Sequence, residues 1–158
     1  MPLPDASVDA VACGDSFHWF DGARAAPELA RVIRPGGLLG LLWNAPAAGA
    51  GTPWSEDLWA ILRAYTPEHP GFTDDQGRDA IDASGRFEPL RSETVPNLHA
   101  TDRAGLVASV ASMSYIALLP ADERRAVLAR VDAVLGEHGV EATDVPLQTK
   151  VWTARRRS

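Results

Sequence analysis

Cysteine is almost absent from the sequence, with Cys13 the only one among 158 residues. One cysteine excludes an internal disulfide and a metal site built from several thiolates. Long apolar runs are also missing, and the run at Leu38–Trp43 is far shorter than the roughly 20 residues that span a bilayer. The sequence therefore predicts no membrane span and no signal peptide, and the cytoplasm as the compartment. Cys13 is predicted to be a packed small apolar side chain.

Positive charge is scarce as well, since the formal net charge is -6. The only basic run, Arg155-Arg156-Arg157, lies at the end of the chain, where a solvated terminus is typical. No nucleic-acid partner is therefore predicted. His69, His99 and His138 have no partner at ligand spacing, so no metal site is predicted either.

Two catalytic fingerprints are missing. No Gly-x-Ser-x-Gly elbow or pair of carboxylates favours a hydrolase. No Gly-x-Gly-x-Gly follows a predicted strand, where such a loop would admit a dinucleotide; Gly49-Ala50-Gly51 lies in a small-residue loop before Pro53. Together with the lack of a tyrosine–lysine pair, this argues against a nicotinamide-dependent oxidoreductase.

The first third of the chain has a strand–helix–strand pattern. Val8–Cys13 is a short apolar strand, and Phe20–Ile33 has apolar residues at helical spacing with Asp21 as a plausible N-cap. Arg34-Pro35-Gly36-Gly37 stops this helix, and Leu38–Trp43 is an apolar second strand. Strands that are apolar on both faces are typical of a parallel sheet covered by helices on each side. The pattern predicts an α/β fold with a right-handed crossover.

The remaining pattern alternates helices with polar loops and strands. It predicts a helix at Pro53–Tyr65 capped by Thr52, a polar loop at Thr66–Gly85 with a helical turn at Arg78–Ala83, an edge or interrupted strand at Phe87–Leu98, a helix from Thr101 to about Ser112, a helix at Ala121–Gly139 and a last strand at Val145–Thr153. No linker or repeat marks a boundary, so residues 1–158 are predicted to be one domain.

Three stretches in order resemble the middle of a class I S-adenosylmethionine (SAM) dependent methyltransferase of the small-molecule, type 11 kind. These stretches are Leu3–Val11, His18-Trp19-Phe20 and Glu28–Gly37. The resemblance implies a Rossmann-like fold, with the last strand antiparallel and inserted between the fifth and sixth strands of the family. The family's glycine-rich loop and its acidic ribose-binding residue would precede Met1. The chain thus resembles a truncated, C-terminal portion, and Met1 is expected to be an internal methionine taken as a start.

The candidate site follows the first predicted strand, because ligands of open α/β sheets bind at the carboxyl ends of the strands. By resemblance, the loop residues expected to contact SAM or the substrate are Gly14, Asp15, Ser16, Phe17, His18 and Trp19. Asp15 could equally be a turn residue.

No catalytic residue stands out, and His18 is the one candidate general base, since histidine titrates near neutral pH. The alternative is structural: the ring of His18 is hydrogen-bonded within the loop and the indole of Trp19 packs on the following helix. Glu28 and Arg31 are predicted to form a surface ion pair. Trp54, Trp59 and Tyr65 either line a small-molecule pocket or belong to the core.

The resemblance implies methyl transfer from SAM to a small molecule, and such an in-line displacement can depend on positioning alone. Two pieces, His18-Trp19-Phe20 and the Ser-x-Ser-Tyr at Ser112–Tyr115, also resemble relatives of trans-aconitate methyltransferase, which would favour a carboxylate substrate. The alternative is a non-catalytic remnant, inactive because the cofactor-binding N-terminal part is absent, that serves as an interaction module. An unpaired edge on Val8–Cys13 would then recruit a second copy, giving a homodimer or larger assembly.

Overall fold

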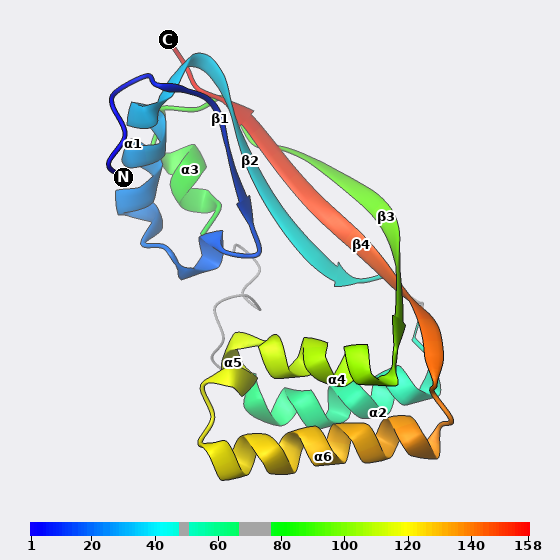
Figure 1. Ribbon diagram of the computed structural model, residues 1–158. Coiled ribbons are helices and arrows are strands. Elements are labelled where there is room, and N and C mark those ends of the chain that lie inside the picture. The colour runs from blue at the N-terminus through cyan, green and yellow to red at the C-terminus, as the bar shows by residue number, and fades with distance from the viewer. Residues whose placement is uncertain (48–50, 67–76) are drawn as a thin grey trace. The chain divides into compact units, whose positions relative to one another are not determined.

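The computed structural model describes residues 1–47, 51–66 and 77–158 (Figure 1). Its elements in chain order are β1 (Val8–Gly14), the 3₁₀ turn η1 (Phe17–Trp19), α1 (Gly22–Val32), β2 (Ile33–Pro46), α2 (Pro53–Leu62), the 3₁₀ turn η2 (Arg63–Tyr65), α3 (Asp79–Ala83), β3 (Arg91–Asp102), α4 (Arg103–Ser112), α5 (Ser114–Ala117), α6 (Ala121–Glu137) and β4 (Ala142–Arg155).

The chain divides into two compact units, which are described separately. The sheet unit comprises Met1–Ala45, Pro70–Val95 and Gln148–Ser158, and the helical unit comprises Pro46–His69 and Pro96–Leu147. That residues 1–158 fold cooperatively as one domain stays a prediction.

The strands follow the order β1-β2-β4-β3. β1 and β2 are parallel, with Val8 opposite Ile33 and Gly14 opposite Leu42. β4 runs antiparallel to β2. The backbone of Gly36, near the start of β2, is hydrogen-bonded to Arg156, whereas that of Ala47, just after β2, is hydrogen-bonded to Pro146. The two predicted strands of the crossover are confirmed, and so is an antiparallel last strand inserted next to β2. The α/β, Rossmann-like prediction is therefore confirmed.

α1 starts where its capping residue predicts. The carboxylate of Asp21 accepts a hydrogen bond from the backbone N–H of Arg24, at 3.2 Å, which satisfies one of the free N–H groups of the first turn. The helix ends at Val32, and Gly36 supplies the positive φ of +75° that the reversal before the apolar part of β2 requires. The apolar side chains of α1 that face the core are Ala26, Leu29, Ala30 and Val32.

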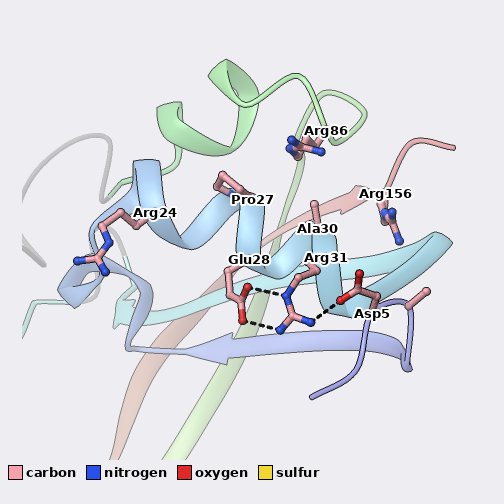
Figure 2. A pocket seen from close by; sticks show the side chains of 9 residues that line it. Asp5, Arg24, Pro27, Glu28, Ala30, Arg31, Arg86 and Arg156 are labelled. Atoms are coloured by element: carbon pink, nitrogen blue, oxygen red, sulfur yellow. Dashed lines mark hydrogen bonds and ion pairs between the residues drawn. The ribbon is translucent and has the colours of Figure 1, made fainter. Parts of the chain in front are cut away.

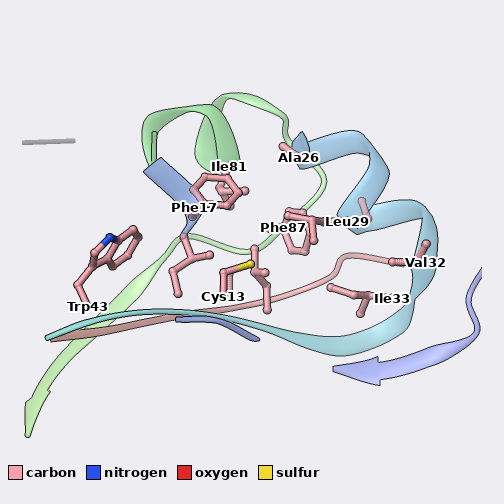
Figure 3. Packing of buried hydrophobic residues seen from close by; sticks show 13 residues of the cluster. Cys13, Phe17, Ala26, Leu29, Val32, Ile33, Trp43, Ile81 and Phe87 are labelled. Atoms are coloured by element: carbon pink, nitrogen blue, oxygen red, sulfur yellow. The ribbon is translucent and has the colours of Figure 1, made fainter. Parts of the chain in front are cut away.

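The sheet unit buries one face of β2. Leu39, Leu41 and Trp43 lie in a core with side chains from α1 and α3, and Figure 3 shows Phe17, Ile81 and Phe87 over the same face. The alternate residues of β2 are less covered: Leu38 is 37% exposed, and Gly40 and Leu42 are half-buried. Apolar residues thus occupy both faces, as predicted, while the helices of this unit cover one of them.

The helical unit packs four helices around its own core. Thr52 and Ser55 form a capping box at the start of α2, and Asp102 caps α4 by accepting from the N–H of Gly105 at 2.7 Å. The predicted apolar face of α6 is confirmed. The buried side chains are Leu58, Ile61, Leu62, Leu106, Val110, Ile116, Val127, Val131, Leu135 and Val140.

Three aromatic residues, for which the sequence allowed either a pocket or a core position, lie at the margin of this core. Trp54, Trp59 and Tyr65 are partly buried and packed against it, which favours the core interpretation over a small-molecule pocket. The predicted helix over Pro53–Tyr65 ends at Leu62 and continues as η2.

The polar segment Thr66–Gly85 is described only in part. Its residues 67–76 lie outside the described residues, and α3 confirms the helical turn predicted at Arg78–Ala83. After an isolated antiparallel bridge from Phe87 to Arg156, β3 begins at Arg91 and forms one edge of the sheet. The prediction of an edge or interrupted strand is therefore confirmed.

Candidate functional site

The loop that follows β1 is anchored by Asp15. Its φ of +44° lies in the left-handed region, which aspartate tolerates better than most residues. Its N–H donates to the carbonyl oxygen of Leu42 at 2.8 Å, and its Oδ1 accepts from the N–H of Asn44 at 3.2 Å. The carboxylate thus ties the start of the loop to the end of the neighbouring strand, as a turn residue does; contact with a cofactor stays a prediction.

A second polar link continues from β2 to β4. The hydroxyl of Thr149 donates to Oδ1 of Asn44 at 2.7 Å. Asn44 therefore connects the loop after β1 through its backbone and β4 through its side chain. Sequence reasoning missed both Asn44 and Thr149, although a polar residue directly after an apolar strand was a usable signal.

Phe17 fixes the middle of the loop. It is fully buried and meets Phe20 edge to face, with ring centroids 5.7 Å apart. A Cβ placed on Gly77 would lie 3.4 Å from the Phe17 ring, an ordinary contact distance, so it is the positive φ of +82° that favours glycine at this position. The burial makes Phe17 an anchor of the loop; its predicted contact with a ligand stays a prediction.

His18 is held by an indole. Nε1 of Trp43 donates to Nδ1 of His18 at 3.0 Å, and Trp43 is only 5% exposed. The structural interpretation of His18 predicted such a ring hydrogen bond. It also predicted a packed Trp19, whereas that side chain is 51% exposed and lies 5.4 Å from the His18 ring, centroid to centroid.

Trp43 belongs to a group of large side chains from different strands. Its ring meets that of Trp152, on β4, edge to face at 5.3 Å between centroids. The guanidinium of Arg78 lies 4.2 Å from the centroid of Trp152 and 5.8 Å from that of Trp43. Such cation–π contacts hold a positive charge beside the His18–Trp43 pair. Neither Trp152 nor Arg78 was predicted as a site residue.

Cys13, the last residue but one of β1, is buried, and burial raises the pKa of its thiol. The thiol is thus a core group beside the candidate loop. This confirms the prediction of a packed small apolar side chain.

A depression of about 490 Å³ lies at the other end of β1 (Figure 2). Its centre is an ion-pair cluster: Arg31 donates to both carboxylate oxygens of Glu28, at 2.8 and 2.7 Å, and to Asp5 at 2.6 Å. Glu28 also accepts from the amino group of Met1 at 2.6 Å. These charges satisfy one another, which favours a structural role and confirms the predicted Glu28–Arg31 pair.

The same cluster shifts the ionisation of its members. The hydrogen bond from Arg31, followed by that from the chain's amino group, lowers the pKa of Glu28 from 4.5 to about 2. The carboxylates of Glu28 and Asp5 in turn raise the pKa of Arg31. Glu28 and Arg31 therefore form a charged pair at neutral pH rather than groups poised to exchange protons.

No group of three or more metal-ligating side chains is found in residues 1–47, 51–66 and 77–158. His138 instead lies 2.8 Å from a carboxylate oxygen of Asp57, within the helical unit. Across the same ranges, no helix combines the length and apolar character needed to span a membrane.

Comparisons with known proteins bear on this geometry. Residues 1–41 match the family described as "Methyltransferase domain". An uncharacterised methyltransferase of Mycobacterium tuberculosis is 38% identical over 138 residues, which cover 87% of this chain and 53% of the relative. An uncharacterised methyltransferase-like protein of Schizosaccharomyces pombe is 34% identical over 134 residues, covering 85% and 51%. Over most of its length the chain is similar to proteins described as methyltransferases.

A solved structure agrees with this assignment at the level of the fold. A protein from Anabaena variabilis, described as a methyltransferase from an antibiotic biosynthesis pathway, is similar with a TM-score of 0.58 and 23% identity, covering 96% of this chain and 68% of that one. The similarity to methyltransferases implies SAM as the cofactor. The chain spans about half the length of the curated relatives it matches.

The six predicted contact residues share one location. Gly14 to Trp19 follow β1 directly, and Asp15 and His18 are hydrogen-bonded to residues at the end of β2. Gly14 is exposed, and a Cβ placed on it would meet no atom within 4 Å. A ligand could therefore approach the backbone at Gly14, while Asp15, Phe17 and His18 keep the loop in place.

Proposed function

We propose that this chain supplies the part of a SAM-dependent methyltransferase that binds the methionine end of the cofactor and a small-molecule methyl acceptor. The observation that carries the proposal is the loop Gly14–Trp19, fixed at the carboxyl ends of the parallel strands β1 and β2. Ligands of open α/β sheets bind at this end.

The residues of the loop fit such a ligand. The open space at Gly14 admits an extended chain close to the backbone, and the exposed indole of Trp19 offers an apolar surface in the same loop. Bound SAM would supply an electrophilic methyl carbon on a positively charged sulfur. The loop would position the acceptor in line with that carbon, which can account for much of the rate without an acid or base.

Calorimetric titration of SAM, and then of S-adenosylhomocysteine, into the purified chain tests this proposal. We expect saturable one-site binding at micromolar affinity. No detectable heat up to millimolar ligand would contradict the proposal and would leave a chain with the fold elements of a methyltransferase but not its binding activity.

A matched pair of variants locates the binding. Gly14→Ala should weaken binding at least about tenfold, because the new methyl group would occupy the space of the ligand while touching no protein atom. Gly51→Ala adds the same methyl group in the helical unit, 3.4 Å from the flexible side chain of Glu56, and should leave affinity unchanged. Equal affinities for both variants would place the ligand elsewhere.

A second candidate function, an interaction module without catalysis, is favoured by the edge position of β1. In the described part of the sheet β1 has one neighbour, β2, and its residues Ala10 and Ala12 are exposed beside Leu38. An unpaired strand edge is a template for pairing with another chain. We propose that a second copy occupies this edge, giving a homodimer or larger assembly.

Light scattering after size exclusion tests the assembly. The chain should elute as a dimer or larger species, and Ala12→Arg should shift it toward the monomer. A monodisperse monomer of the unmodified chain at dilute concentration would contradict the assembly. If the Ala12→Arg monomer still binds SAM, the assembly through β1 and the binding of the cofactor are separate properties.

A cytoplasmic location, a carboxylate acceptor and the lack of a nucleic-acid partner stay predictions.

A further inference from the structure

We propose that Trp43 is a positioning residue that holds His18 in the neutral form protonated on Nε2. Nε2 of His18 would then carry a proton and could not take one from a ligand as a general base. The part about the ligand rests on the proposed function, whereas the protonation state of the ring follows from the hydrogen bond to Trp43.

The hydrogen bond between Trp43 and His18 has a direction that is fixed by chemistry. An indole N–H can only donate, and a neutral imidazole has one nitrogen that donates and one that accepts. Nε1 of Trp43 lies 3.0 Å from Nδ1 of His18, so Nδ1 must be the accepting nitrogen. The proton of the neutral ring is therefore on Nε2. A ring protonated on both nitrogens would place two N–H groups against each other.

The indole has little freedom to release this contact. Trp43 is 5% exposed within the core of the sheet unit, and its ring packs edge-on against that of Trp152 at 5.3 Å. Figure 3 shows Trp43 beside Phe17 and Cys13 over the same sheet. A buried indole N–H requires an acceptor, and the described acceptor is Nδ1 of His18. The packing of Trp43 thus sets the protonation of a loop residue on a different element.

The consequence concerns where a proton can go. A general base at Nε2 would need a lone pair on that nitrogen, which the Nε2–H form lacks. In methyl transfer the lone pair of the acceptor forms the new bond to carbon as the C–S bonding pair returns to sulfur. Any proton that the acceptor sheds would therefore pass to water and not to this nitrogen.

Two-bond ¹H–¹⁵N correlation spectra of the ¹⁵N-labelled chain at pH 8 test the proposal without any ligand. Spectra of His18→Gln identify the signals of His18 among the four histidines. We expect a pyridine-type shift for Nδ1 and a pyrrole-type shift for Nε2, the signature of a single tautomer. A pyrrole-type Nδ1, or averaged shifts for both nitrogens, in the unmodified chain would overturn the proposal.

Two variants separate positioning from packing. Trp43→Phe keeps an aromatic ring but removes the donor, and the shifts of His18 should move toward the averaged values of a free imidazole. Trp152→Phe alters the neighbouring ring but keeps the donor, and the single tautomer should persist. An unchanged tautomer in a folded Trp43→Phe would contradict the role of Trp43; if that variant does not fold, the spectrum of the unmodified chain still decides.

This test is independent of cofactor binding. A chain that shows the fixed tautomer but no SAM binding would keep the Trp43 proposal and lose the proposed function. A chain that binds SAM but has the proton on Nδ1 would do the reverse.

Discussion

The sheet unit and the helical unit use polar side chains in different ways. In the sheet unit, Asp15, His18 and Asn44 join loop residues to the ends of different strands. In the helical unit, the polar pairs brace one helix against another: Arg103 binds both carboxylate oxygens of Asp132, at 2.7 and 2.8 Å, and His138 lies beside Asp57. The first arrangement orients a loop, whereas the second holds a scaffold together.

The two units also differ in where non-glycine residues adopt a positive φ. Among the described residues, the non-glycine positions with positive φ are Ala6 and Asp15, and both belong to the sheet unit. Strain of this kind persists where the surroundings impose it, and it concentrates at functional sites. We expect the candidate chemistry in the sheet unit, at Asp15 and the residues that follow it.

The largest expected losses of stability come from two core variants, which test whether the two units unfold together. Phe17→Ala and Leu135→Ala each remove a fully buried side chain, one from each core. We expect losses of about 3–5 kcal/mol for the first and about 2–5 kcal/mol for the second, measured by urea unfolding. If residues 1–158 are one cooperative domain, both variants lower the same single transition, followed by circular dichroism.

A control and a contrary result are available for this pair. Leu118 is 81% exposed, so Leu118→Ala should change the free energy of unfolding by less than about 0.5 kcal/mol. Two separate transitions, each moved by only one of the two core variants, would contradict the one-domain prediction and would make the units independent.

Helix caps give a smaller, matched effect in both units. Asp21→Ala removes the cap of α1, and Thr52→Ala removes the cap of α2. Each should lower the free energy of unfolding by about 1 kcal/mol, because a side-chain acceptor for a first-turn N–H is lost. Asp21→Asn keeps an acceptor and should retain most of the stability. Equal losses for Asp21→Ala and Asp21→Asn would show that charge, and not capping, matters at this position.

Acid should act on the sheet unit through Glu28. Its pKa is lowered from 4.5 to about 2 by Arg31 and the amino group of Met1, so its contribution is complete above pH 4.5. Stability from this group is lost as the pH falls from about 4.5 to about 2, since in that window the unfolded state binds a proton that the folded state does not. Glu28→Gln should flatten the pH dependence of the midpoint of unfolding in that window.

The helical unit offers the comparison for this prediction. Arg103 lowers the pKa of Asp132, so Asp132→Asn should likewise remove part of the acid sensitivity. If Glu28→Gln has the same pH dependence as the unmodified chain, the ion-pair cluster around Arg31 does not stabilise the folded state.

The smallest expected effect concerns the rate at which the thiol of Cys13 is alkylated. Burial and the raised pKa of the thiol predict slow alkylation by iodoacetamide in the folded chain and fast alkylation in urea. Mass spectrometry over time measures both rates, and Cys13→Ser provides the blank. Equal rates with and without urea would mean that the core of the sheet unit opens freely.

The elements of residues 8–43 could be predicted from the sequence because their signals are local. Apolar periodicity marks β1 and β2, and the capping residue Asp21 and the stop at Pro35-Gly36 bound α1. The position of the candidate loop followed from the same pattern. The pattern did not predict which elements cover the sheet, because an apolar face on a strand does not specify its neighbour.

The contacts within the site could not be predicted in this way. The partner of His18 is Trp43, 25 residues away, and the partner of Asn44 is Thr149, 105 residues away. Such pairs depend on strand order and register, which single-residue patterns do not encode. The contacts of Arg78 with Trp43 and Trp152 combine three separate elements and carry no local signal at all.

One measurement tests most directly whether the chemistry belongs to the sheet unit. S-adenosylhomocysteine is titrated into the ¹⁵N-labelled chain, and backbone amide shifts are followed by NMR. Saturable shifts concentrated at Gly14 to Trp19, with the amides of Val127 to Leu135 unchanged, are the predicted result. Shifts confined to the helical unit, or no shifts up to millimolar ligand, would contradict a cofactor site in the loop after β1.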